Sequence, residues 1–193
     1  LDLSKYKYGI GNKINLSLPY FVFLIHPVTT SYSKNLNLIN SVLKLIPKLQ
    51  NQIVWIWPNN DAGANLITKK IRSFRENNDN LKISFLTNLE TDDYLKLIKN
   101  SICLIGNSSS GIREGSYLGI PTVNIGNRQN LRERGDNVID VEVNSNKILK
   151  AINKILQKKI KKSKLYGDGN SVKKIIKILS TKKLDTSKIF FFK

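Results

Sequence analysis

The sequence reads ICLIGNSSSGIREG from Ile102 to Gly115. Its first four apolar residues predict a short buried strand, and the glycines and serines that follow predict a tight turn leading directly into a helix. Similar apolar, β-branched or aromatic runs recur at Tyr20 to Ile25, Ile53 to Trp57, Leu81 to Leu86, Thr122 to Ile125 and Val138 to Val141. Each of these runs predicts another buried strand.

Segments with helical spacing separate the predicted strands. Leu38, Val42 and Leu45, for example, lie three or four positions apart, which is typical of an amphipathic helix. Strands that are apolar on both faces and alternate with helices predict a parallel sheet that is covered on both sides. The predicted fold class is therefore α/β, a doubly wound, Rossmann-like parallel sheet. Two further helices are expected at 146–158 and 171–179.

Composition and length favour one globular domain. The 193 residues are 40% hydrophobic and 24% charged, as in ordinary folded proteins. Residues 1–19 are polar and irregular and are expected to be a linker from an upstream domain, 20–180 to form the sheet domain, and 181–193 a basic and aromatic tail. The longest apolar stretch is too short to span a bilayer, and the first residues do not resemble a signal peptide. We therefore expect a cytoplasmic protein without a membrane partner.

The net charge of +18 is concentrated near the C-terminal end. From Lys147 onward the chain has 15 lysines and two acidic residues. Proteins that bind nucleic acid usually combine arginines with exposed aromatic residues, whereas these lysines alternate with isoleucines at helical spacing. We interpret them as solvated helix faces and expect no nucleic-acid partner. A polyanion-binding module that uses this tail remains an alternative.

The serine-rich turn is a candidate diphosphate site. In an open parallel sheet, ligands bind at the carboxyl ends of the strands, and the free N–H groups at the start of a helix bind phosphate. Ser108, Ser109, Ser110 and Gly111 occupy this position, and their small size allows a ligand to approach the backbone. Alternatively, Ser108 or Ser109 only caps the helix. We favour binding, because capping does not require three serines between glycines.

Polar residues at three other strand ends extend this candidate site. His26, the only histidine of the chain, follows the first strand and is a candidate catalytic group. Asn59 and Asp61 follow the second strand and either contact the ligand or cap the next helix. Arg128 follows the fifth strand and is suited to pair with a diphosphate. One histidine and one cysteine do not make a metal site, so neither a metal nor a cofactor is expected.

These residues lie in phrases that resemble the C-terminal domain of UDP-N-acetylglucosamine 2-epimerases. The phrases are HPVTT (26–30), PNNDAG (58–63), GNSSSGIRE (106–114), GIPTVNIGNRQ (119–129), RERGDNV (132–138) and YGDGN (166–170). Their order and spacing agree as well. The likeness is closest to the hydrolysing branch, which releases N-acetylmannosamine and UDP for sialic-acid-type sugar synthesis and includes relatives that act on diacetamido sugars.

The resemblance implies roles for individual residues within a two-domain GT-B-type fold. It places the serines and Arg128 near the diphosphate, Glu114 near the ribose, and His26 beside the diphosphate as a catalytic group. The implied UDP-binding residues are Ser108, Ser109, Ser110, Gly111, Glu114, Arg128, Asn59, Asp61 and Asn88. At Asn88 the animal relatives carry a histidine.

The resemblance also implies that this chain is only half of an enzyme. The family's reaction breaks the bond between the sugar and UDP by elimination through a glycal, to which water then adds. Its catalytic carboxylates belong to an N-terminal domain, so we expect that domain as a partner and no turnover by this chain alone. Family members commonly form dimers, and no feature of this sequence decides the oligomeric state. Two alternatives are the C-terminal domain of a GT-B glycosyltransferase and a non-catalytic UDP-binding module.

Overall fold

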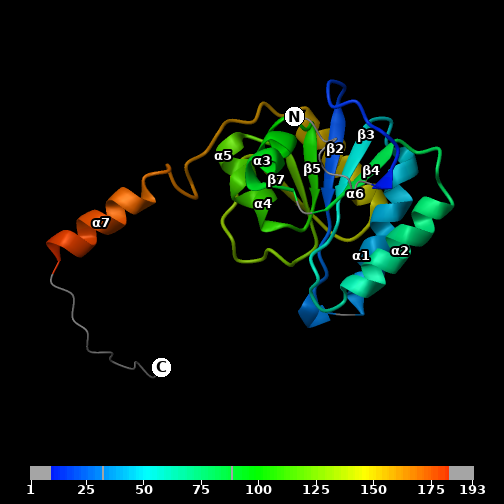
Figure 1. Cartoon of the computed structure of the whole chain (residues 1–193), viewed down its shortest axis with the longest axis horizontal. Helices are drawn as coiled ribbons and strands as arrows, with labels where there is room; N and C mark the ends of the chain where they lie inside the picture. Colours follow the sequence, from blue (N-terminus) through cyan, green and yellow to red (C-terminus); the bar gives the residue numbers. More distant parts are fainter. Residues whose placement is uncertain (1–9, 32, 88, 183–193) are drawn as a thin grey trace.

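A computed structural model describes residues 10–31, 33–87 and 89–182. Within these residues the chain forms one seven-stranded sheet with helices on both faces (Figure 1). The strands are β1 (Ile10–Gly11), β2 (Tyr20–Leu24), β3 (Gln52–Ile56), β4 (Ile83–Leu86), β5 (Cys103–Gly106), β6 (Thr122–Ile125) and β7 (Val138–Val141). The helices are α1 (Lys34–Leu45), α2 (Ala64–Glu76), α3 (Thr91–Lys99), α4 (Ser109–Ile112), α5 (Glu114–Leu118), α6 (Ser145–Leu156) and α7 (Ser171–Thr181), with 3-10 turns η1 (Thr29–Ser31) and η2 (Ile46–Lys48).

The order of the strands confirms the predicted doubly wound fold. Across the sheet it is β1-β4-β3-β2-β5-β6-β7. Neighbouring strands from β4 to β7 pair in parallel, and among the strands of the described residues only β1 is antiparallel. The chain builds the sheet outward from β2 through β3 and β4, then returns to the other side of β2 with β5. The strands β2 and β5 therefore flank the point at which the direction of building reverses, where such sheets bind their ligands.

Alternate residues of β2 face two different helical layers. Phe21 and Phe23 belong to the larger apolar core, which also contains residues of α1, α2 and α6. Tyr20, Val22 and Leu24 belong to a smaller core with residues of α3. This period of two is that of a strand buried on both faces, and it explains why the run is apolar without interruption.

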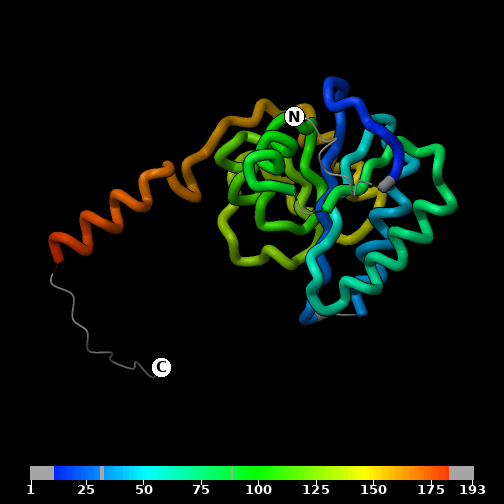
Figure 2. Tube along the Cα trace, in the orientation of Figure 1, coloured from blue at the N-terminus to red at the C-terminus, as the bar shows by residue number. Residues whose placement is uncertain are grey.

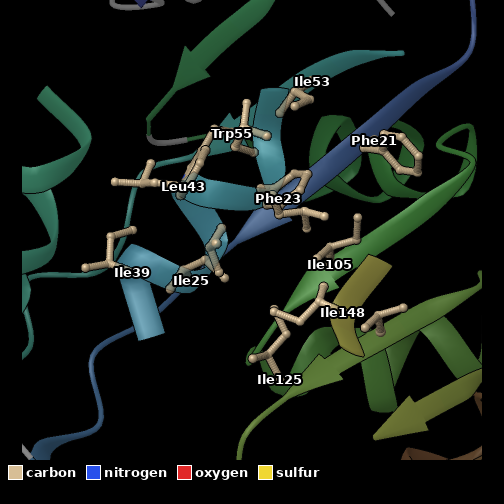
Figure 3. Packing of buried hydrophobic residues seen from close by; sticks show 14 of the residues in the cluster. Phe21, Phe23, Ile25, Ile39, Leu43, Ile53, Trp55, Ile105, Ile125 and Ile148 are labelled. Atoms are coloured by element: carbon tan, nitrogen blue, oxygen red, sulfur yellow. The ribbon is translucent and has the colours of Figure 1, made fainter. Parts of the chain in front are cut away.

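A row of aromatic rings lies in the larger core. Phe23 stacks on Trp55 with 5.3 Å between ring centroids, and Trp55 stacks on Phe85 at 6.0 Å. Figure 3 shows Phe23 and Trp55 on the sheet, with Ile39 and Leu43 of α1 beside them. Large rings bury much apolar surface and pack with a specific geometry. They therefore hold β2, β3 and β4 in fixed positions, and with them the loops at the strand ends.

Part of the expected linker 1–19 belongs to the sheet. Ile10 of β1 pairs with Phe85 of β4. The backbone N–H of Asn15 donates to Oε1 of Gln52 at 2.7 Å, and Nε2 of Gln52 donates back to the Asn15 carbonyl at 2.9 Å. The expectation of an irregular segment is therefore wrong for Ile10–Gly11, although the proposed domain boundaries remain a prediction.

Helix α7 projects away from the rest of the domain (Figures 1 and 2). None of its residues is buried, and its apolar side chains are all exposed: Val172, Ile175, Ile176, Ile178 and Leu179. The predicted helix over 171–179 is confirmed, but it does not cover the sheet. The last residues of the tail, 183–193, lie outside the described residues. No helix within the described ranges is long and apolar enough to cross a membrane.

Candidate functional site

The candidate site lies where β2 and β5 end. The two strands are paired up to Leu24 and Gly106. An ideal Cβ on Gly106 would lie 2.0 Å from the carbonyl oxygen of Leu24, so only glycine allows this approach. Beyond this pair the chain enters the His26 segment on one side and the serine-rich turn on the other. The residues that follow both strands are therefore brought side by side.

Asn107 joins these two strand ends through its side chain. The backbone N–H of His26 donates to Oδ1 of Asn107 at 2.7 Å, and Nδ2 of Asn107 donates to the His26 carbonyl at 2.8 Å. Asn107 is fully buried at 0% exposure. Since buried backbone groups need partners, this pair of bonds fixes the backbone of His26 against the start of the turn.

The carbonyl of Asn107 also holds the loop that carries Arg128. Nη1 of Arg128 donates to this oxygen at 3.2 Å, and Nε2 of Gln129 donates to it at 2.9 Å. Arg134 secures the same loop, because its Nη2 donates to the Gln129 carbonyl at 2.9 Å while its Nε bonds Asp140 of β7 at 3.0 Å. Asn107 is thus the point at which three separate segments of the chain meet.

His26 is surrounded by the other predicted strand-end residues. The backbone N–H of Asn59 donates to its Nδ1 at 3.5 Å, a long hydrogen bond. Burial and, to a smaller extent, the positive charge of Arg128 lower the pKa of His26 against the opposing carboxylate of Asp61, and the net result is a fall from 6.5 to about 4. The imidazole is therefore neutral at pH 7. Because Nδ1 accepts a hydrogen bond, we assign the ring proton to Nε2, which makes Nε2 a hydrogen-bond donor.

The serines form the start of α4 and are bonded to one another. Ser108 is the N-cap residue, and its Oγ accepts from the backbone N–H of Ser110 at 3.3 Å. Ser110 Oγ lies 3.1 Å from Ser108 Oγ and 2.5 Å from the hydroxyl of Tyr94 on α3. The capping alternative is therefore confirmed for Ser108, but it does not account for Ser110, whose hydroxyl belongs to a longer chain of hydrogen bonds.

The remaining predicted residues differ in their surroundings. Gly111 packs against β6, where an ideal Cβ would lie 2.5 Å from Cγ2 of Thr122, so its lack of a side chain is explained by the close approach of α4 to the sheet. Contact between Gly111 and a nucleotide remains a prediction. Glu114 lines a cavity of about 420 Å³ with Tyr117 and Tyr166. Asn88 lies outside the described residues, and its role also remains a prediction.

A second cavity, of about 650 Å³, lies next to the cluster at the ends of β3 and β4. It is lined by Ile56, Trp57, Pro58, Asn59, Asn60, Thr87, Leu89 and Tyr94. Asn59 connects this cavity to His26, and Tyr94 connects it to Ser110. The cavity and the cluster therefore form one continuous region that combines apolar walls with polar groups, as small-molecule sites do.

Most of the clustered residues were predicted from the sequence, but two were not. The structure places His26, Asn59, Asp61 and Arg128 near one another, and the serines directly follow Asn107. Asn107 and Tyr94 were not predicted as site residues. For Asn107 the available signal was its position immediately after a buried strand. No group of three or more potential metal ligands is found among the described residues.

Comparison with known proteins gives a consistent result. A family model described as UDP-N-acetylglucosamine 2-epimerase matches residues 2–180. A UDP-N,N'-diacetylbacillosamine 2-epimerase (hydrolyzing) from Legionella pneumophila is 34% identical over 181 residues, covering 93% of this chain and 46% of that protein. A UDP-N-acetylglucosamine 2-epimerase from Neisseria meningitidis is 29% identical over 133 residues, covering 69% and 34% respectively. The chain spans about half the length of the curated relatives it matches.

Solved structures show the same fold at low sequence identity. The crystal structure of UDP-GlcNAc 2-epimerase from Neisseria meningitidis bound to UDP-GlcNAc has a TM-score of 0.67 at 16% identity, covering 88% of this chain and 46% of that one. The enzyme from Methanocaldococcus jannaschii, in complex with UDP-GlcNAc and UDP, has a TM-score of 0.64 at 20% identity, covering 84% and 46%. These likenesses confirm the Rossmann-like architecture.

Proposed function

Because the chain belongs to the UDP-N-acetylglucosamine 2-epimerase family, we propose that it is the nucleotide-binding half of a hydrolysing 2-epimerase. Its substrate is UDP-N-acetylglucosamine or a related UDP-diacetamido sugar, and the products are the free 2-epimer and UDP. The observation that carries this proposal is the convergence of His26 and Arg128 on Asn107, where the doubly wound sheet reverses direction. The relatives' names and the fold support the nucleotide-sugar class.

The proposed ligand lies across the carboxyl ends of the strands. The diphosphate contacts the serine turn, Arg128 and His26, since a guanidinium and hydroxyl donors suit a dianion. The nucleoside extends to Asn59 and Asp61 and the adjoining cavity of about 650 Å³. Glu114, the expected partner of the ribose, lies close enough to Tyr94 of that cavity to act on it electrostatically. That cavity is large enough for a base and a ribose, because small-molecule pockets begin at about 300 Å³.

The chemistry assigned to this half is stabilisation of the leaving group. In the elimination, a base removes the proton from C2 of the sugar, the bond between C1 and the diphosphate oxygen breaks, and UDP departs as an anion. Water then adds to C1 of the glycal while C2 is protonated. Arg128 offers positive charge, and neutral His26 donates a hydrogen bond from Nε2 to the departing diphosphate. The base at C2 is assigned to the other half of the enzyme, since the curated relatives are about twice as long as this sequence.

Helix α7 supports the proposal that a second half is required. The family match runs to residue 180 and so includes nearly all of this helix. Yet five of its apolar side chains are 49 to 67% exposed, and exposed apolar surface of this kind marks contact sites. We assign this face to the other half of the enzyme, which relatives twice as long contain. Turnover therefore requires both halves, and this chain mixed with UDP-N-acetylglucosamine yields no N-acetylmannosamine.

Titration calorimetry with UDP tests the site directly. The 193-residue chain is expected to bind UDP, and Arg128→Ala to weaken binding about 10- to 100-fold, because a hydrogen bond between charged groups contributes about 1.5 to 3 kcal/mol. Arg132→Ala is the matched control, since it removes the same charge from an exposed position on the same loop. Absence of UDP binding by the unaltered chain, or equal losses in both variants, would contradict the proposed site.

A further inference from the structure

Tyr94 stands at one end of a chain of three hydrogen-bonded hydroxyl groups. Its hydroxyl lies 2.5 Å from Oγ of Ser110, which lies 3.1 Å from Oγ of Ser108. Ser108 Oγ also accepts from the backbone N–H of Ser110 at 3.3 Å. Packing of α3 accounts for the ring of Tyr94, but not for its hydroxyl, which a phenylalanine would lack without loss of apolar contact.

Either oxygen of each hydroxyl pair can donate, so an anion at the serine turn sets the direction of the chain. When Ser108 gives its hydrogen to the anion, its two lone pairs accept from the hydroxyl and from the backbone N–H of Ser110. Ser110 has then given up its hydrogen and accepts in turn from Tyr94. Burial raises the pKa of Tyr94 to about 12, so its hydroxyl keeps the hydrogen that this direction requires. In this direction the Ser108 hydrogen points out of the chain, and Tyr94 is the last donor.

We propose that Tyr94 is a positioning residue that orients the hydroxyls of Ser110 and Ser108, so that Ser108 presents a hydrogen to the diphosphate. This inference rests on the proposed function, because it requires an anion at the serine turn. Tyr94 does not touch the diphosphate itself and acts through Ser110. Successive hydrogen bonds in a low-dielectric site polarise one another, so the hydroxyl of Tyr94 makes the hydroxyl of Ser108 a stronger donor.

Loss of the tyrosine hydroxyl removes this constraint. Ser110 is then free to accept a hydrogen from Ser108, which turns a lone pair of Ser108 towards the diphosphate. An oxygen lone pair repels an anion that a hydroxyl hydrogen would attract. The expected penalty therefore falls on the diphosphate and not on the nucleoside.

Binding of UDP and of uridine, measured by calorimetry, tests the inference with four variants. Tyr94→Phe is expected to weaken UDP binding about 3- to 10-fold, the range for one hydrogen bond, and to leave uridine binding within about 2-fold. Ser110→Ala should weaken UDP binding similarly. The double variant Tyr94→Phe/Ser110→Ala should be no weaker than Ser110→Ala, because the two residues act in series. Ser73→Ala, at an exposed position of α2 that lines neither cavity, should leave both affinities unchanged.

Three outcomes would overturn the inference while the UDP site stands. They are an unchanged UDP affinity in Tyr94→Phe, independent losses that multiply in the double variant, and an equal loss of uridine binding. The last result would mean that the Tyr94 hydroxyl contacts the nucleoside directly from the cavity that Tyr94 lines. If the unaltered chain binds no UDP, the proposed function fails and this inference fails with it.

Discussion

Asn107→Asp is the most informative single change, because it alters one side-chain hydrogen bond of Asn107 and leaves the volume of the side chain almost unchanged. Oδ1 can still accept from the backbone N–H of His26. In the unaltered chain, Nδ2 of Asn107 donates to the His26 carbonyl at 2.8 Å. In the variant a carboxylate oxygen takes the place of Nδ2, so two oxygens face each other. We therefore expect both the free energy of unfolding and the UDP affinity to fall.

The size of the effect follows from the burial of Asn107. A buried acceptor left without a donor costs about 1 to 3 kcal/mol. Burial of the introduced carboxylate adds a desolvation cost, which Arg128 offsets in part. The expected loss is about 3 to 5 kcal/mol at pH 8, a large part of the ~5 to 15 kcal/mol that usually stabilises a domain.

The same reasoning gives the pH dependence of the variant. Burial raises the pKa of the introduced carboxyl above that of the unfolded chain. The folded state then binds more protons than the unfolded state, so the destabilisation is greatest at high pH and shrinks as the pH falls. Once protonated, the carboxyl again donates to His26.

Urea unfolding followed by tryptophan fluorescence at pH 8 and pH 6 measures this difference between variant and unaltered chain. Asn127→Asp introduces the same charge at an exposed position of the Arg128 loop and should change stability by less than about 0.5 kcal/mol. The reasoning is refuted if Asn107→Asp is as stable as the unaltered chain at pH 8, or if its deficit does not shrink at pH 6.

Two further predictions concern His26 and α7. The pKa of His26 is about 4 in the folded chain against an ordinary 6.5, so the unfolded state binds the proton more readily. The free energy of unfolding should therefore be constant above pH 6.5 and fall by about 3 kcal/mol towards pH 4. Urea titrations of His26→Gln over this pH range should lack this fall. Ile175→Glu on α7 should shift the melting temperature by less than about 2 °C, since the side chain is 55% exposed, whereas Leu43→Glu in the core should unfold the chain. If Ile175→Glu melts much lower, α7 packs on this domain and not on the other half.

The parallel strands were predictable because burial on both faces leaves a simple pattern. Thr122–Ile125 and Val138–Val141 form strands with the predicted bounds, and the other four begin and end within about two residues of them. Ile10–Gly11 leaves no such pattern, because a two-residue edge strand is defined by its pairing with β4. For α7, helical spacing predicted the helix, but spacing alone does not indicate what covers its apolar face.

The candidate site was predictable to the extent that sheet topology determines it. His26 and Arg128 follow strands that end at one edge of the sheet, so their proximity follows from a parallel fold. Asn107 bonds to a residue 81 positions earlier in the chain, and no local pattern encodes that contact. Tyr94 occupies an apolar position of a helix, and its hydroxyl becomes significant only when α3 is placed beside α4.

Asn107 explains how loops from distant parts of the chain can present a fixed set of donors. The side chain of a loop residue moves readily unless its backbone is held. Here the backbone of His26 is held by two bonds to Asn107, and Arg128 and Gln129 both donate to the Asn107 carbonyl. The bonds to His26 take up groups that β2 leaves unpaired as it diverges from β5, so the requirement to satisfy buried backbone groups also places the imidazole next to the guanidinium. Stability and ligand binding therefore depend on the same residue, and a substitution there should impair both together.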